Sequence, residues 1–96
     1  MKREEALQLS HHHRPELVSR FGVKRLALFG STARDEARED SDVDVLVDFD
    51  RPSFRAFMGL KFYLEDCLHT SVDLVMLDSV RAPLKPYIQR EVVDVA

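Results

Sequence analysis

The sequence has little of several residue types, and each shortage excludes a class of protein. Its single cysteine, Cys67, cannot form an internal disulfide, which favours a reducing compartment, so we expect a cytoplasmic protein. Three glycines and four prolines in 96 residues leave no room for flexible linkers or a collagen-like repeat. No apolar run approaches the roughly 18 residues that cross a bilayer. The charged residues 1–5 are not followed by the apolar segment of a secretory signal.

The chain also lacks an excess of positive charge. Fourteen Lys and Arg residues stand against seventeen Asp and Glu residues, for a net charge of −3. Proteins that bind nucleic acid non-specifically carry a basic excess, so direct nucleic-acid binding is not expected. Nor is membrane binding. The length suits one globular domain over residues 1–96, with its core at about 15–80.

The order of the expected elements predicts an α/β fold. Short helices are expected first, then strands and helices alternate, which is typical of a small mixed β-sheet of about three strands flanked by helices. The expected helices cover residues 3–10, 15–21, 30–37, 53–68 and about 84–93, and the expected strands cover 23–29, 43–49 and 72–77. A short connection predicts that the first two strands are antiparallel, and the intervening helix predicts that the last two are parallel.

Gly30-Ser31 lies where the first strand leads into a short helix. Glycine lets a ligand approach the backbone closely, and the free N–H groups at a helix start bind anions. Local capping explains a Gly-Ser pair equally well, and no Gly-Lys-Ser/Thr follows, so this is not a Walker-type loop.

Two aspartates follow at the start of the next strand, in Ser41-Asp42-Val43-Asp44. Alternation along a strand puts Asp42 and Asp44 on one face, about 6.5–7 Å apart. Two such carboxylates favour a hard divalent cation such as Mg²⁺ between them. The alternative is a solvated strand edge, where acidic residues deter aggregation.

A third carboxylate, Asp73, interrupts the apolar run Val72–Leu77. A carboxylate in a buried strand needs a cationic partner, and Lys61, Arg34 or a metal ion could supply it. The expected strand directions bring the Gly30 loop and all three acids to one edge of the sheet.

Taken together, Gly30-Ser31-x-Ala33-Arg34, Ser41-Asp42-x-Asp44 and Asp73 resemble the signature of nucleotidyltransferases related to polymerase beta. The short length resembles their minimal, MNT-type branch, whose members often pair with HEPN-domain proteins as toxin–antitoxin systems. The likeness runs from residue 21 to residue 75 and implies the minimal nucleotidyltransferase fold. One departure is Asp35, which stands where the family often has glycine.

The resemblance also implies roles for the site residues. Gly30 and Ser31 would hold the β- and γ-phosphates of a nucleoside triphosphate, and Ser41 joins this nucleotide-binding set. Arg34 would either contact phosphate or brace the loop by pairing with Asp42 or Glu36, and we favour bracing. The acids Asp42 and Asp44 would bind two Mg²⁺ ions. Asp73 would complete the site nearer the attacking hydroxyl as a ligand of the catalytic metal, and it could also serve as a base.

The function implied is transfer of AMP from ATP to a hydroxyl, expected to be that of a tyrosine, on a partner HEPN toxin, so that the chain acts as an antitoxin. Two alternatives stay open: a non-catalytic antitoxin that masks its partner, and a nucleotidyltransferase acting on a small molecule. The minimal core leaves no second domain to hold an acceptor. The acceptor must therefore bring its own surface, or the chain must form a homodimer or hetero-oligomer. His11–His13 is expected to be exposed surface or a partner contact.

Overall fold

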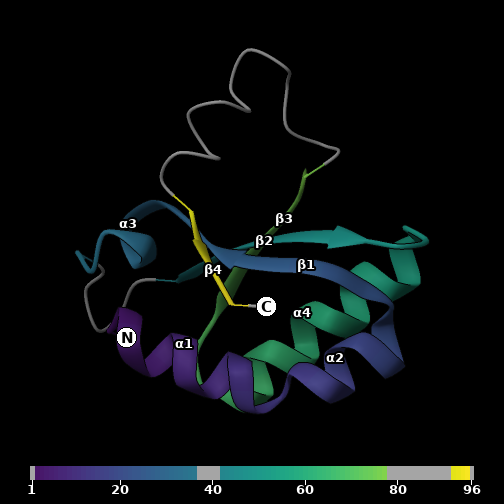
Figure 1. Ribbon diagram of the computed structural model, residues 1–96, viewed down its shortest axis with the longest axis horizontal. Coiled ribbons are helices and arrows are strands. Elements are labelled where there is room, and N and C mark those ends of the chain that lie inside the picture. Colours follow the sequence, from purple (N-terminus) through teal and green to yellow (C-terminus); the bar gives the residue numbers. More distant parts are fainter. Residues whose placement is uncertain (1, 37–41, 78–91, 96) are drawn as a thin grey trace.

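A computed structural model describes residues 2–36, 42–77 and 92–95 (Figure 1). The described elements in chain order are α1 (Arg3–His12), α2 (Arg14–Phe21), β1 (Val23–Leu28), α3 (Gly30–Ala33), β2 (Val43–Phe49), α4 (Phe54–Leu68), β3 (Val72–Met76) and β4 (Val93–Asp94). The strands form one mixed sheet in the order β3-β2-β1-β4. The predicted α/β fold with a small mixed sheet is confirmed, with four strands in the described residues in place of about three.

Strand pairing sets which residues meet at the edge of the sheet beside α3. Strand β1 is antiparallel to β2, with Leu28 opposite Val45. Strand β2 is parallel to β3, with Asp44 opposite Asp73. Both predicted directions are confirmed. As a result, the end of β1 and the beginnings of β2 and β3 lie at the same side of the sheet.

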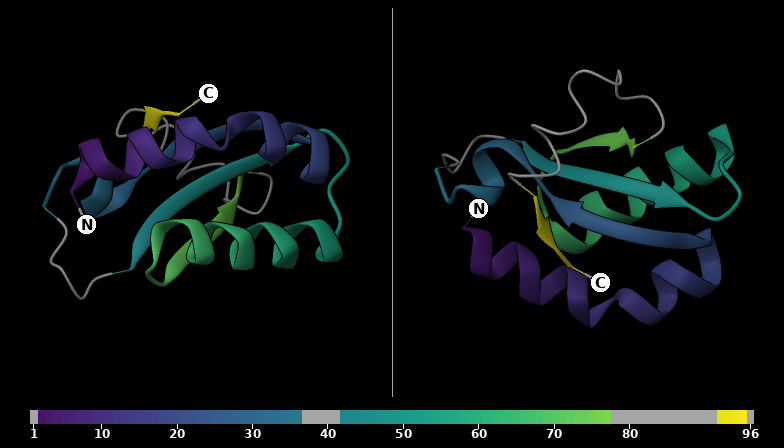
Figure 2. Two further views of the ribbon diagram at one scale, coloured as in Figure 1. Left: turned by 90° about the horizontal axis from the view of Figure 1, so that it is seen from below. Right: turned by 45° about the horizontal axis from the view of Figure 1, so that its top comes forward.

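Helices α1, α2 and α4 all lie on one face of the sheet (Figures 1 and 2). The apolar residues of β2 that face them alternate along the strand, and those of α4 recur every four residues, so each set forms one stripe. The main contributors to this core are Val43, Val45, Val47, Leu60, Leu64 and Leu68. The intervening residues of β2, Asp44 among them, project from the other face. Within the described residues, no helix is both long and apolar enough to cross a membrane.

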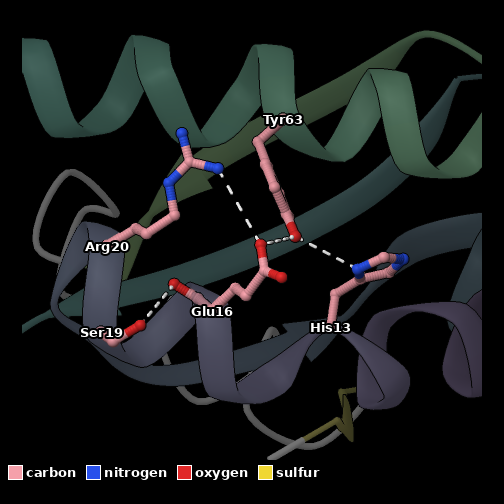
Figure 3. A network of polar contacts seen from close by, with 5 residues as sticks. All are labelled: His13, Glu16, Ser19, Arg20 and Tyr63. Atoms are coloured by element: carbon pink, nitrogen blue, oxygen red, sulfur yellow. Dashed lines mark hydrogen bonds and ion pairs between the residues drawn. The ribbon is translucent and has the colours of Figure 1, made fainter.

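A polar network joins α2 to α4 at the edge of this core (Figure 3). The Tyr63 hydroxyl donates to Glu16 Oε2 at 2.8 Å and lies 3.1 Å from His13 Nδ1. The Arg20 guanidinium stacks 5.3 Å from the centre of the Tyr63 ring. Burial, with the hydrogen bond to Glu16, raises the pKa of Tyr63. The expectation for the histidine tract therefore holds for His11 and His12, which are exposed, whereas His13 is half-buried in this network.

The prediction of a C-terminal helix over about residues 84–93 is wrong at its last residue. Val93 begins β4, which pairs antiparallel with β1, and the Val95 N–H donates to the Leu26 carbonyl at 2.9 Å. An ion pair of 2.9 Å between Arg25 and Asp94 adds to this pairing. The β-branched residues here suit a strand, and β1 supplies the partner that a local sequence pattern cannot show. Residues 84–91 of the predicted helix lie outside the described part of the chain.

The short helix predicted over residues 30–37 is also wrong in length, because α3 ends at Ala33. Asp35 has φ of +59°, in the left-handed region, which a right-handed helix cannot continue through. The helix is therefore a single turn between β1 and this reversal.

Glu65 fixes the start of β3 from the last turns of α4. Its Oε2 accepts the Val72 N–H at 3.0 Å and Lys61 Nζ at 3.2 Å. The hydrogen bond from Val72 is the main reason that the pKa of Glu65 lies below its ordinary value. Since Val72 directly precedes Asp73, this carboxylate helps to place the third acid of the predicted site.

The lowered pKa of Glu65 predicts a pH dependence of stability. A depressed carboxyl pKa stabilises the fold above the unfolded pKa, and this contribution is lost as the pH falls through the folded pKa. Glu65→Gln keeps an oxygen for Val72 but not the charge, so it should lower the free energy of unfolding at pH 7 by about 1 kcal/mol. Urea unfolding from pH 7 down to pH 3 should show a smaller pH dependence in the variant, and identical profiles would contradict the assignment.

Candidate active site

Three carboxylates lie near one another on the face of the sheet opposite α1, α2 and α4. Asp44 and Asp73 are in register on the parallel strands β2 and β3, whose backbones lie about 4.8 Å apart. Asp42 precedes Asp44 by two residues and therefore shares its face. The negative charges of Asp73 and Asp42 both act on the Asp44 carboxyl. The structure thus brings together the three acids that the sequence predicted.

The environment of Asp73 differs from the prediction. The sequence suggested a buried carboxylate, but Asp73 is exposed, while its neighbours Val72 and Leu74 are only 2% and 6% exposed. The physical reason is alternation, since β3 is an edge strand whose covered face takes Val72 and Leu74. Asp73 therefore needs no cation to stay in the fold, and solvent and ligands can reach it.

The cations suggested for Asp73 have partners elsewhere. Lys61 pairs with Glu65, as described above, and Arg34 Nε pairs with Glu36 Oε2 at 3.0 Å. Glu36 is one of the two bracing partners considered for Arg34. A role of Arg34 toward phosphate stays a prediction. Ser41, the other nucleotide-binding candidate, lies outside the described residues.

The pKa of Asp44 is raised above its ordinary value. Partial burial is the largest cause, and the negative charges of Asp73 and Asp42 act in the same direction. Hydrogen bonds from the hydroxyl and backbone of Ser31 oppose this shift. The carboxylates therefore repel one another, and a divalent cation among them would relieve the repulsion.

Both the backbone conformation and a close contact favour glycine at position 30. Its φ is +60°, a conformation that residues with a side chain rarely adopt. A Cβ on Gly30 would also lie 2.7 Å from Asp44 Oδ2, inside the contact distance of the two atoms. The turn between β1 and α3 therefore lies directly against the Asp44 carboxylate, which would have to move if position 30 carried a side chain.

Thr32 holds the backbone of Asp44 in place, a contact that the sequence did not reveal. Its Oγ1 accepts the Asp44 N–H at 3.0 Å, and its side chain is completely buried. Two further contacts join the same segments, since Ser31 Oγ donates to Asp44 Oδ2 at 3.3 Å and the Phe29 N–H donates to the Asp44 carbonyl at 3.1 Å. The only sequence signal was a hydroxyl residue at the variable position of Gly-Ser-x-Ala-Arg.

The donor set fits magnesium that arrives with a nucleotide. Among residues 2–36, 42–77 and 92–95, no three His, Cys, Asp or Glu side chains converge closely enough to hold an ion by themselves. Magnesium is usually bound by one or two carboxylates together with water and substrate phosphates, so a closed cage is not needed. Asp42, Asp44 and Asp73 supply the hard oxygen ligands for such an open site.

A pair of glycine substitutions separates the two requirements at position 30. Gly22 has a similar φ of +66°, but a Cβ added there would meet no atom within 4 Å, so Gly22→Ala incurs only the backbone penalty. We expect Gly22→Ala to lower the free energy of unfolding by about 1–2 kcal/mol. Gly30→Ala should lower it by about 1–3 kcal/mol more because of the overlap with Asp44. Urea unfolding measures both, and equal losses would show that the contact with Asp44 imposes no constraint.

Comparison with known proteins places this geometry in a family. A profile of the nucleotidyltransferase domain matches residues 11–95. The protein adenylyltransferase MntA of Thermococcus cleftensis is 47% identical over 91 residues, which cover 94% of this chain and 92% of that protein. A solved structure described as a candidate minimal nucleotidyltransferase is 36% identical, with a TM-score of 0.82 over 97% of this chain and 95% of the other.

Complexes of toxins with antitoxins share the fold at lower identity. The structure of a tri-AMPylated Shewanella oneidensis HEPN toxin with its MNT antitoxin matches with a TM-score of 0.66 and 22% identity, over 94% of this chain and 71% of that one. A toxin–antitoxin structure with AMP-PNP matches with a TM-score of 0.73 and 22% identity, over 90% and 72% of the two chains. The domain match, the relative at 47% identity and the conjunction of Gly30 with the acids agree, and the chain belongs to the nucleotidyltransferase family.

Proposed function

We propose that this nucleotidyltransferase is a magnesium-dependent antitoxin that transfers AMP from ATP to a tyrosine hydroxyl of a HEPN-domain toxin. One observation carries the proposal: the Asp44 carboxylate lies in register with Asp73 on one side and against Gly30 on the other. This arrangement supports the proposal, because the turn that would bind phosphate lies beside acids that would bind the metal ions. Two ions held there would stabilise the entering and leaving oxygens of the displacement.

The residues of the chain divide the work of binding and orientation. Gly30 and Ser31 bind the β- and γ-phosphates, because the glycine allows the phosphate oxygens to approach the backbone closely. Asp42 and Asp44, with Asp73, would hold the magnesium ions, which would supply positive charge beside the phosphates. Arg34 and Ser41 complete the nucleotide-binding set, with Arg34 acting from its position beside Glu36.

In the transfer, the acceptor oxygen forms a bond to the α-phosphorus of ATP. The bond from that phosphorus to the oxygen bridging to the β-phosphate breaks, and pyrophosphate leaves. Asp73 accepts the proton of the acceptor hydroxyl. The exposure of Asp73 supports this role, because an acceptor on another protein can reach an exposed carboxylate on the face opposite α1, α2 and α4.

A protein acceptor is supported by the relatives. The Thermococcus protein, similar over 94% of this chain, is a protein adenylyltransferase, and the Shewanella complex contains an AMPylated HEPN toxin. The AMP-PNP in a second toxin–antitoxin structure supports ATP as the donor. The described residues form one sheet with its helices, so a protein acceptor would contribute its own recognition surface.

The acids provide the first test. Asp42→Ala combined with Asp44→Ala should reduce AMP transfer by at least about a hundredfold, because metal-ion charge stabilisation is worth several kcal/mol. The far-ultraviolet circular dichroism spectrum should stay native, since neither side chain belongs to the apolar core. Full activity in the double variant would contradict the metal assignment.

The acceptor provides the second test. A HEPN-domain protein encoded beside this chain would be incubated with a trace of the chain, ATP and Mg²⁺, and its intact mass recorded. We expect gains in units of one AMP that are absent with Asp42→Ala. A stable one-to-one complex without a mass change would instead indicate a masking antitoxin. If neither a complex nor a mass change is observed, the result contradicts a protein acceptor and favours a small-molecule substrate.

A further inference from the structure

Asp35 adopts a backbone conformation that glycine would adopt at no cost. Its φ of +59° lies in the left-handed region, where aspartate is tolerated but glycine is favoured. Its own N–H donates to the Thr32 carbonyl at 3.2 Å, which closes the turn onto α3. A side chain at this position therefore needs a compensating contact, and the structure provides one.

That contact reaches the start of α1. Asp35 Oδ1 accepts the backbone N–H of Arg3, the first residue of α1, at 2.9 Å. The residue at the N-cap of α1, Lys2, makes no side-chain capping bond. Asp35 thus does for α1 what a capping serine or aspartate does for its own helix, but from 32 residues away. Its negative charge also suits the positive end of the helix.

A second bond runs between the same two segments. Arg3 Nη1 donates to the Ala33 carbonyl, at the last residue of α3, at 3.2 Å. The backbone of Arg3 therefore holds the turn at Asp35, and its side chain holds the end of α3. Together these bonds form a clamp between α1 and α3, which we call the Arg3–Asp35 clamp.

The clamp matters because α3 cannot place itself. A helix of four residues is far too short to be stable alone, so its position depends on what it is attached to. On one side it is attached to β2 through the bonds of Ser31 and Thr32 to Asp44. On the other side it is attached to α1 through the clamp.

We propose that Asp35 is a positioning residue that holds the Gly30–Ser31 turn in place through α1. This rests on the proposed function, in which that turn binds the nucleotide phosphates. Without the Asp35 carboxylate, α3 keeps its attachment to β2 and the bond from Arg3 Nη1 to the Ala33 carbonyl, but the turn that follows α3 loses its bond to the start of α1. Ser31 is then less firmly held against Asp44, and nucleotide affinity falls.

Two variants at position 35 separate the carboxylate from the backbone. Asp35→Gly accepts the left-handed conformation but removes the capping oxygen, whereas Asp35→Asn keeps an oxygen acceptor and tolerates the same conformation. Binding of α,β-methylene-ATP with Mg²⁺ would be measured by calorimetry, because this analogue cannot transfer AMP and needs no acceptor. Amide hydrogen exchange would be followed by nuclear magnetic resonance at Arg3 and Asp44.

We expect Asp35→Gly to raise the dissociation constant about two- to fivefold and to speed exchange at both amides, with Asp35→Asn close to the wild type. Unchanged affinity and unchanged Asp44 exchange in Asp35→Gly would overturn the proposal, even if the melting temperature fell. Equal losses in both variants would also overturn it. If the wild type bound the analogue but transferred no AMP, the proposed function would fail while these measurements still decided the role of Asp35.

Discussion

The placement of Asp44 is the constraint on which the rest of the site depends. Its N–H is held by Thr32, its carbonyl by the Phe29 N–H, and its carboxylate by Ser31. A side chain at position 30 would require that carboxylate to shift, because its Cβ would lie 2.7 Å from Asp44 Oδ2. Parallel pairing then carries the position of Asp44 across to Asp73. Asp44 thus connects the Gly30–Ser31 turn to the other two acids.

The division of the sheet into two faces explains how a small domain can support this concentration of charge. Helices α1, α2 and α4 cover the face that takes Val43, Val45 and Val47, and hydrophobic burial on that side stabilises the fold (Figure 1). The other face is free to carry Asp44 and Asp73, whose mutual repulsion would be costly inside a core. The residues that form the apolar core and the acids of the candidate site therefore lie on opposite faces of the same strands.

The features of this arrangement that follow from a local residue pattern could be predicted from the sequence. Alternating valines predicted β2 and the face of Asp44, and the intervening helix predicted a parallel β3. Contacts between distant segments were not predictable in the same way. The two-residue β4 depends on pairing with β1, Thr32 acts on a residue twelve positions away, and an apolar run around Asp73 does not distinguish a one-sided from a two-sided strand.

The direct bonds between α3 and β2 have a consequence for how this site can change during evolution. Because Thr32 and Ser31 bond directly to Asp44, these contacts set the separation of α3 and β2, and the connection between Asp35 and Ser41 need not set it. Insertions or deletions in that connection should be tolerated, since lengthening a loop costs little entropy. Substitutions at Gly30 and Asp44 should therefore be coupled, whereas the number of residues between them can vary among proteins that share this fold.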